Sequence, residues 1–404
     1  MKLSEICDIN RSNVIFTKDQ MVDYLDTGNL TEGVIDSLTK VRYDEAPSRA
    51  QRAVQKNTIL YSTVRPNLKH YGILEERNPN MVVSTGFATI DIKENKKEEI
   101  DAHFLYYLIT QPWVTEHLHT IAQSSVSSYP SISPNDIGNL EFRFPRIDDQ
   151  RRIASVLSNL DRKIALNRQI NTNLEALARQ LYDYWFVQFD FPDANGKPYK
   201  SSGGKMTYNE KLKRNIPDGW EVKNIFDAVD VLYGFPFNAD LFTTETTTIP
   251  VIRIRDILEG NISTYTTECV NEKYRLHEKD VVIGMDGNFH MGIWHNNDAY
   301  LNQRCVRLRA NEKTEISAIQ ILYTTQPYIK YREKTIIGST VGHLSDKDMK
   351  ALYILVPVGN KYFAPRKTMD SITQQIIENK KQITSLTKQR DELLPLLMNG
   401  QVII

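Results

Sequence analysis

The feature that most constrains this 404-residue chain is that its second half repeats the first at a nearly constant offset in residue number. The segment 140–145 recurs as 352–357, and its closing proline, Pro145, returns as Pro357, at an offset of 212. A period near 200 residues is too long for a solenoid and is typical of duplicated domains. The same offset continues through apolar positions spaced as in a heptad, pairing Leu160 with Ile372, Ile164 with Ile376, Leu174 with Leu386, and Leu181 with Leu393.

Earlier in the chain the matching segments keep their order while their offset grows, as insertions in surface loops would cause. The matches are 110–112 with 325–327 (offset 215), 56–62 with 278–284 (offset 222) and 30–33 with 257–260 (offset 227). The chain therefore reads as two copies of a globular unit, each followed by one long helix. Such a molecule suits a two-fold partner or a target that is read in two halves.

Composition indicates a soluble protein with ordinary cores, since 41% of the residues are hydrophobic and 25% are charged. Fifty basic and fifty acidic residues cancel, which argues against a surface coated for non-specific nucleic-acid binding but leaves room for local basic faces. The first residues have no apolar core of signal-peptide length, and no window is apolar enough for a membrane helix. A cytoplasmic location is the default expectation.

From Ile153 onward apolar and amide residues recur at spacings of three and four, which is the a/d pattern of a coiled coil. A second such pattern begins at Ile372. Each stripe must be buried, and the nearest partner is the other helix, so we expect antiparallel pairing within one chain. Asn167 and Asn379 hold the same heptad slot; buried, they fix the register, although both could instead be solvated. The residues expected to pair the helices are Leu160, Ile164, Asn167, Leu174, Leu181, Ile376, Asn379, Leu386 and Leu393.

The expected fold class is α+β, with two domains of mixed sheet and short helices separated by the paired helices in a pseudo-two-fold arrangement. The first domain covers 1–147 and the first helix 148–190; Pro, Gly, Ser and Asn then mark a linker over 191–215. The second domain covers 216–359, and the second helix with its tail covers 360–404. An antiparallel pair would carry the two domains to opposite ends. A 30-residue helix is ~45 Å long, close to the ~34–36 Å between DNA half-sites one turn apart.

Catalytic motifs are missing from the sequence. It has no Gly-x-x-x-x-Gly-Lys-Ser/Thr loop for ATP and no Asn/Asp-Pro-Pro-Tyr/Phe tetrapeptide of the kind with which amino-methyltransferases hold a base. The carboxylates and lysine of 217–223 are spaced too tightly for a nuclease, and Pro-Asp-Gly there is typical of a turn. The three cysteines form no Cys-x-x-Cys pair. We therefore expect no catalytic residue, no cofactor site and no metal site in this chain, which reads as a binding protein.

Polar loops that follow expected strands recur at equivalent places in both copies, and their chemistry differs between the copies. Arg, Lys and His in these loops suit phosphates or guanine edges, Asn suits adenine, and Ser or Thr suits phosphate and sugar. Each of these residues alone is more simply a solvated loop residue; the matched set is what points to a reader of an asymmetric sequence. The candidates for DNA binding are Arg49, Arg52, Ser62, Arg65, Asn67, Lys69, His70, Ser127 and Tyr129 in the first copy, and Arg253, Arg255, Asp286, Asn288, His290, Thr340 and His343 in the second.

Several motifs make the chain resemble the specificity subunit of Type I restriction-modification systems over its whole length. The segment 145–154 resembles the family's Pro-x-x-x-Glu-Gln-x-x-Ile entry to its first conserved helix, with Asp149 in the usual Glu position. The segments 181–186 and 215–220 resemble the end of that helix and the entry to the second domain, and 390–400 resembles the typical C-terminal ending. As a departure, 369–372 lacks the Gln-Arg-x-Ile entry.

The resemblance implies that each domain is a target-recognition domain reading one half of a bipartite site in double-stranded DNA, with the helices as a ruler between the halves. It also implies two modification subunits that carry S-adenosylmethionine and the methyltransferase chemistry, and restriction subunits that carry ATP, Mg and cleavage. Two alternatives stay open: a coiled-coil assembly scaffold that reads no DNA, and a recognition module from a fused restriction-methylation enzyme. No base contact follows from the resemblance, because recognition domains vary within the family.

Overall fold

The computed structural model divides into two compact units, which we treat separately. Unit 1 contains Met1–Lys163 and the C-terminal segment from Leu386, and unit 2 contains Ile164–Ser385. The structure describes residues 1–11, 13, 16–76, 78–124, 129–258, 260, 262–296, 298–311, 314–335, 342–358 and 363–402.

Unit 1 is built on two four-stranded sheets. The first is antiparallel, in the order β1 (Cys7–Ile9), β10 (Phe87–Ile92), β7 (Ile59–Ser62) and β8 (Tyr71–Ile73). The second has the order β5 (Thr39–Arg42), β2 (Met21–Leu25), β9 (Met81–Ser84) and β6 (Ala50–Ala53), and its β2–β9 pair is parallel. A short ribbon, β3 (Leu30–Thr31) with β4 (Val34–Ile35), lies beside β8, where the amide of Gly33 donates to the carbonyl of Tyr71 over 2.8 Å. The helices are α1 (Leu3–Ile6), α2 (Ala102–Ile109), α3 (Pro112–Gln123) and α4 (Pro134–Gly138).

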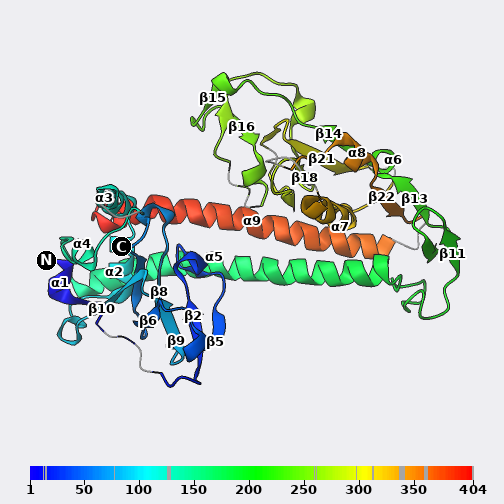
Figure 1. Cartoon of the computed structure of the whole chain (residues 1–404). Coiled ribbons are helices and arrows are strands. Elements are labelled where there is room, and N and C mark those ends of the chain that lie inside the picture. The colour runs from blue at the N-terminus through cyan, green and yellow to red at the C-terminus, as the bar shows by residue number, and fades with distance from the viewer. Residues whose placement is uncertain are drawn as a thin grey trace. The chain divides into compact units, whose positions relative to one another are not determined.

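Unit 2 repeats the antiparallel sheet strand for strand (Figure 1). Its copy has the order β14 (Val229–Tyr233), β21 (Cys305–Ala310), β18 (Val281–Gly284) and β19 (Met291–Ile293). Its second sheet has the order β15 (Phe242–Thr243), β17 (Tyr265–Thr266), β16 (Ile249–Ile252) and β20 (Tyr300–Leu301), again with one parallel pair, β16–β20. The pair β13 (Glu221–Asn224) and β22 (Tyr353–Val356) is antiparallel, and the helices are α6 (Ile225–Ala228), α7 (Ala318–Thr335) and α8 (Asp346–Lys350).

Small details confirm the duplication that the sequence predicts. Asn57 and Lys279, at an offset of 222, both have left-handed backbones, with φ of 67° and 73°. Ser133 and Ser345, at an offset of 212, each begin a short helix with a capping box. In both units a threonine hydroxyl at the matching Thr-Gln-Pro position donates to a carbonyl four residues earlier. Unit 1 breaks its helix there into α2 and α3, whereas α7 continues through its proline.

Two 36-residue helices follow the sheets of the two units: α5 (Ile147–Tyr182), green in Figure 1, and α9 (Phe363–Met398), orange to red. In unit 2 they are antiparallel, because partners on α9 fall in number as those on α5 rise. Asn167 donates to the side chain of Gln382 over 3.1 Å, and Asn379 donates to that of Asn171 over 2.9 Å. The side-chain amides of these heptad positions are therefore hydrogen-bonded between the two helices. This favours a role in fixing the register of the helix pair over simple exposure to water.

Unit 1 holds the other segments of the same two helices, again antiparallel. Leu157 of α5 and Leu397 of α9 lie in one buried core with residues of the first sheet, and Arg390 pairs with Asp161. Antiparallel pairing within the chain is thus confirmed in each unit.

Burial along the seam is less complete than the heptad pattern predicts. Ile164 and Ile376 are buried, whereas the other apolar positions expected to be buried, Leu160, Leu174, Leu386 and Leu393, are only half-buried, as is Leu181. Two helices alone cover only one side of each stripe. Full burial occurs instead where a domain also packs on the helix, as at Ala154, Leu157 and Ala178.

The segment expected to be a linker, 191–215, is folded in unit 2. It contributes β11 (Met206–Asn209) and part of β12 (Arg214–Pro217), which form a hairpin. The ring of Phe191 stacks on Tyr199 and on Trp220, with centroids 4.7 and 4.9 Å apart. Aromatic side chains thus hold a stretch whose Pro, Gly and Ser content is typical of a loop.

Gln150 joins the segment before α2 to the start of α5. Its side chain is fully buried; the amide oxygen accepts from the backbone of Asp101 over 3.0 Å, and the amide nitrogen donates to the carbonyls of Glu99 and Pro145, both over 2.9 Å. Asp101 is itself the N-cap of α2, accepting from the amide of Phe104. One side chain therefore fixes the start of α2 relative to α5.

We expect Gln150→Ala to lower the free energy of unfolding by about 2–4 kcal/mol, because it leaves buried backbone groups without partners. Urea denaturation followed by circular dichroism measures this. The matched control is Gln180→Ala on the exposed face of α5, expected to change stability by less than about 0.5 kcal/mol. Equal effects of the two substitutions would show that Gln150 does not hold this junction.

Candidate nucleic-acid interface

The loop after β7 in unit 1 has an unusual backbone. A 3-10 turn, Pro66–Leu68, lies between Arg65 and Lys69, whose φ values of 49° and 55° are left-handed. This conformation costs roughly 1–2 kcal/mol per non-glycine residue, so surrounding contacts must impose it. The amide of Arg65 donates to the carbonyl of Pro130 over 2.9 Å, and Val64 forms a β-bridge with Ser131.

Unit 2 makes the same junction with other residues. Asp286, at offset 222 from Val64, forms a β-bridge with His343, at offset 212 from Ser131. The amide of Gly287 donates to the carbonyl of Gly342 over 2.9 Å. In each unit the two polar loops that the sequence singles out are therefore brought together into one surface. Ser127 and Thr340, predicted within these loops, lie outside the described residues.

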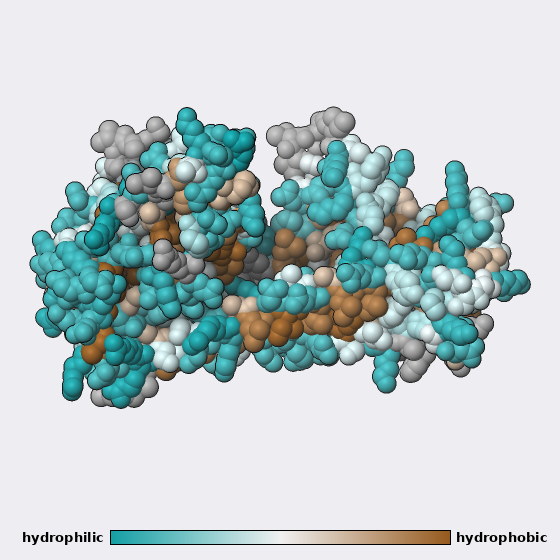
Figure 2. Space-filling view, turned by 90° about the horizontal axis from the view of Figure 1, so that it is seen from below, coloured by the Kyte–Doolittle hydropathy of each residue, from teal (hydrophilic) through white to brown (hydrophobic). Residues whose placement is uncertain are grey.

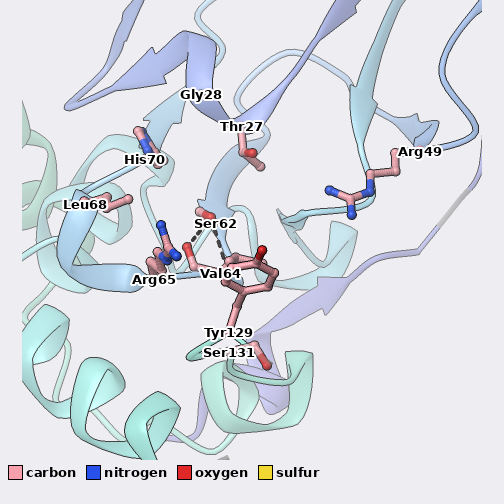
Figure 3. A pocket seen from close by; sticks show the side chains of 10 residues that line it. All are labelled: Thr27, Gly28, Arg49, Ser62, Val64, Arg65, Leu68, His70, Tyr129 and Ser131. Carbon is pink, nitrogen blue, oxygen red and sulfur yellow. Dashed lines mark hydrogen bonds between the residues drawn. The ribbon is translucent and has the colours of Figure 1, made fainter. Parts of the chain in front are cut away.

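A cavity of about 420 Å³ opens on this surface in unit 1 (Figure 3). Five predicted residues line it: Arg49, Ser62, Arg65, His70 and Tyr129. The guanidinium carbon of Arg65 lies 5.0 Å from the centre of the Tyr129 ring, a cation–π geometry. His70 Nδ1 lies 2.7 Å from the carbonyl oxygen of Leu30. No acidic side chain is among the described residues that line the cavity, so these residues favour an anionic or acceptor-rich ligand.

The other first-copy candidates that the structure describes do not line this cavity. Lys69 forms an ion pair with Glu32 over 2.7 Å, and Asn67 is exposed on the 3-10 turn. Arg52 donates to the side chain of Asn13 over 3.5 Å. Thr27 and Gly28 do line the cavity, and sequence reasoning missed them because nothing in a short turn marks it as facing a loop that is distant along the chain.

The matching surface of unit 2 is organised around a carboxylate. Asp286 accepts from His343 Nδ1 over 2.6 Å and pairs with Arg304 over 2.9 Å. Asn288 is exposed beside it, and His290 Nδ1 lies 3.3 Å from the carbonyl of Ile254, much as His70 meets Leu30 in unit 1.

Arg304 was not predicted, and the structure places it in a turn that both repeats share. Its carbonyl accepts from the amide of Met285, just as that of Gly86 in the first repeat accepts from the amide of Thr63. The turn before β10 in unit 1 and the turn before β21 in unit 2 are thus a third segment of this surface, next to the two polar loops.

Arg253 and Arg255 lie apart from that carboxylate. The guanidinium of Arg253 stands 6.0 Å from the Phe242 ring centre, and Arg255 donates to the hydroxyl of Ser263 over 3.0 Å. Neither shares a contact with Asp286 or His343 among those that the structure describes. They extend the candidate surface without belonging to its centre.

Other functions find little support in the described residues. Among them, no group of three or more His, Cys, Asp or Glu is placed to hold a metal ion. No helix in that part of the chain is long and apolar enough to cross a membrane. Burial raises the pKa of the Cys305 thiol to about 12, so this cysteine is not poised as a nucleophile.

Two copies of one α+β unit, each with its own polar loop surface and both built on segments of the same helix pair, define a two-domain recognition protein. The sequence matches the family profile described as "Type I restriction modification DNA specificity domain" twice, over residues 1–176 and 217–389. The chain belongs to this family, and the resemblance read from its motifs is confirmed.

Individual relatives agree with the family match. The chain is 26% identical to the Type I restriction enzyme MjaIX specificity subunit of Methanocaldococcus jannaschii, with 87% of this chain and 79% of the relative covered. It is 23% identical to the HindI specificity subunit of Haemophilus influenzae, with 94% of each covered. The solved S subunit from M. genitalium has the same fold, with a TM-score of 0.56 at 18% identity, covering 98% of this chain and 95% of that one.

Proposed function

We propose that this chain is the DNA-reading subunit of a Type I restriction-modification complex and carries no catalysis of its own. Each unit reads one half of a bipartite, asymmetric site, and the helices set the spacing between the halves. The observation that carries the proposal is the repeated loop surface: the same backbone junction presents Arg65 and Tyr129 in unit 1 but Asp286, Arg304 and His343 in unit 2. Equal geometry with unequal chemistry suits a target whose halves differ.

Unit 1 offers mainly hydrogen-bond donors. The planar guanidinium of Arg65 matches the O6 and N7 acceptors of guanine, and its stacking on Tyr129 keeps it oriented before DNA binds. Arg49 and His70 line the same cavity and suit a phosphate or a second acceptor. Lys69, already paired with Glu32, is better suited to contact the phosphate backbone of the DNA at the edge of this surface.

Unit 2 offers both donors and an acceptor. The Asp286 carboxylate suits an exocyclic amine of cytosine or adenine, and Arg304 and His343 beside it can donate. Asn288, exposed on the same loop, suits adenine. The two halves of the site should therefore differ in base composition.

An exposed apolar strip on α5 supports docking of the modification subunits. Leu166, Ile170 and Leu177 are 60%, 37% and 43% exposed, and Figure 2 shows apolar surface along this part of the helix. Large side chains aligned at helical spacing on a solvated face suit a partner's helix. The modification subunits would supply S-adenosylmethionine and methyl transfer, and restriction subunits would supply ATP-driven translocation and cleavage.

A coiled-coil scaffold without DNA readout predicts no sequence-dependent DNA binding at all. Gel-shift assays of the chain with and without its modification partner separate the two functions. Binding to one duplex sequence in preference to a scrambled duplex supports the reading role. Equal binding to both, with the partner present, contradicts it.

Single substitutions in the loops should act on one half-site each. We expect Arg65→Ala to weaken binding by about 1–3 kcal/mol and to relax one position of the first half-site, while Asn288→Ala or His290→Ala affects only the second. Lys69→Ala should lower the affinity for all DNA sequences alike. It should also reduce the slope of log affinity against log salt concentration by about one. Methylation-motif profiling of the four variants with the modification partner measures this. Unchanged motifs and affinities in all four would place the DNA-facing surface elsewhere, on the side of Arg253 and Arg255.

Spacing and base identity should be separable. A heptad inserted between Ile164 and Asn171 of α5, with a matching heptad between Asn379 and Leu386 of α9, keeps the helices in register. Seven residues add ~10.5 Å, or about three base pairs of ~3.4 Å, to the gap, with unchanged half-site bases. Motif profiling measures the gap. The insertion in α5 alone is the control and is expected to destabilise the protein. Altered half-site bases in the double insertion would contradict the claim that the helices set only the spacing.

A further inference from the structure

The apolar seam cannot by itself decide which helices pair. The two helices carry matching residues at the same heptad positions, such as Ile164 with Ile376 and Leu174 with Leu386. A helix α5 could therefore bury nearly the same stripe against α5 of a second copy as against α9 of its own chain. Something other than apolar burial must favour pairing of unlike helices.

One polar contact in unit 1 has no counterpart in the other repeat. Arg390 of α9 donates to Asp161 Oδ1 over 3.1 Å, and Tyr107 of the recognition fold donates to Asp161 Oδ2 over 2.6 Å. The two charged side chains are 20% and 33% exposed, so the pair is only partly screened by water. Burial, followed by the charge of Asp161, raises the pKa of Tyr107, which keeps its hydroxyl a donor.

The equivalent positions in the other repeat carry no charge. The offset of 212 maps Asp161 onto Thr373 and Arg390 onto Ala178, and both side chains are fully buried in unit 2. Pairing α5 with α5 of a second copy would set Asp161 opposite position 178, an alanine. Pairing α9 with α9 would set Arg390 opposite position 373, a threonine. Each like pairing removes the opposite charge that faces Asp161 or Arg390 across the helix pair, although Arg390 keeps the carboxylate of its own neighbour, Asp391, at 2.8 Å. Loss of the facing charge is unfavourable at these partly buried positions.

The amide contacts discriminate less, because each like pairing keeps one of the two. Asn379 bonds to Asn171, and the counterpart of Asn379 in the first repeat is Asn167. A pairing of two α5 helices could thus keep an Asn–Asn contact but would set Asn167 opposite Ile170 in place of Gln382. A pairing of two α9 helices would set Asn379 opposite Ile383 in place of Asn171. The ion pair, by contrast, is lost in both like pairings.

We propose that the Asp161–Arg390 pair selects pairing of α5 with α9 of the same chain and excludes a two-copy assembly in which like helices pair. The selection ensures that one chain presents one copy of each recognition fold. Only this purpose rests on the proposed function; the pairing preference itself is independent of DNA.

The test uses the full-length chain without DNA and measures molar mass by light scattering over a range of concentrations. Asp161→Arg places an arginine opposite Arg390 when α5 pairs with α9. When α5 pairs with α5 of a second copy, the new arginine lies opposite Ala178. We expect the wild-type chain to stay a single-chain species and D161R to self-associate at least tenfold more tightly. The double reversal D161R/R390D should restore the single-chain species. Lys163→Asp, a charge reversal at an exposed position two residues along α5, should leave the mass unchanged.

A D161R variant with wild-type mass at all concentrations, or a double reversal that associates as the single variant does, would overturn the proposal. Should D161R not fold, the unfolding midpoints in urea of D161A, R390A and D161A/R390A decide the matter. The proposal expects the double variant to lose clearly less than the two single losses added together, and additive losses would contradict it. Because no DNA is present, failure here leaves the reading role standing, and failure of that role leaves this result intact.

Discussion

Burial of the heptad positions between α5 and α9 is the contact on which both units depend, because each unit is built on a segment of each helix. Unit 1 in particular needs the end of the chain: Leu397 is buried in the same core as Leu3 and Leu157. Its core closes only when segments from the two ends of the sequence meet. Such long-range contacts make folding slow and favour a chain that is complete before its first domain is stable.

The two repeats share their backbone features and differ in the side chains that their loops expose. The order of the antiparallel sheet, the left-handed residues before β7 and β18, and the β-bridge between the two polar loops recur in both units. The side chains that those loops present do not recur. In the proposed function, such a shared junction beneath differing side chains lets the recognised bases change without altering the fold.

The helix pairing and the correspondence of the loops could be predicted from the sequence, because periodicity and duplication can be read directly from the order of the residues. The heptads predicted antiparallel pairing, and the offsets 222 and 212 predicted which loops correspond. The burial of Ala154 was missed, since alanine adds little to an apolar pattern and only the domain packed on it explains the burial. Arg304 and Thr27 were missed because they meet the predicted loops only through the fold.

The site was harder to predict than the fold for a physical reason. A loop residue's role depends on the direction of its side chain, which the sequence does not carry: Arg65 turns into the cavity with Tyr129, whereas Lys69, four residues on, turns to Glu32. The linker shows the same limit, because its Gly and Ser content is visible, but the stacking of Phe191 on Trp220 is not.

The central claim is that one chain reads two unlike half-sites at a fixed separation. Methylome sequencing of a host that expresses the wild-type chain with its modification partner tests it most directly. We expect a single asymmetric motif: two different short half-sites separated by a constant number of unspecified base pairs. A contiguous motif, two identical half-sites, or a gap of variable length would contradict this claim.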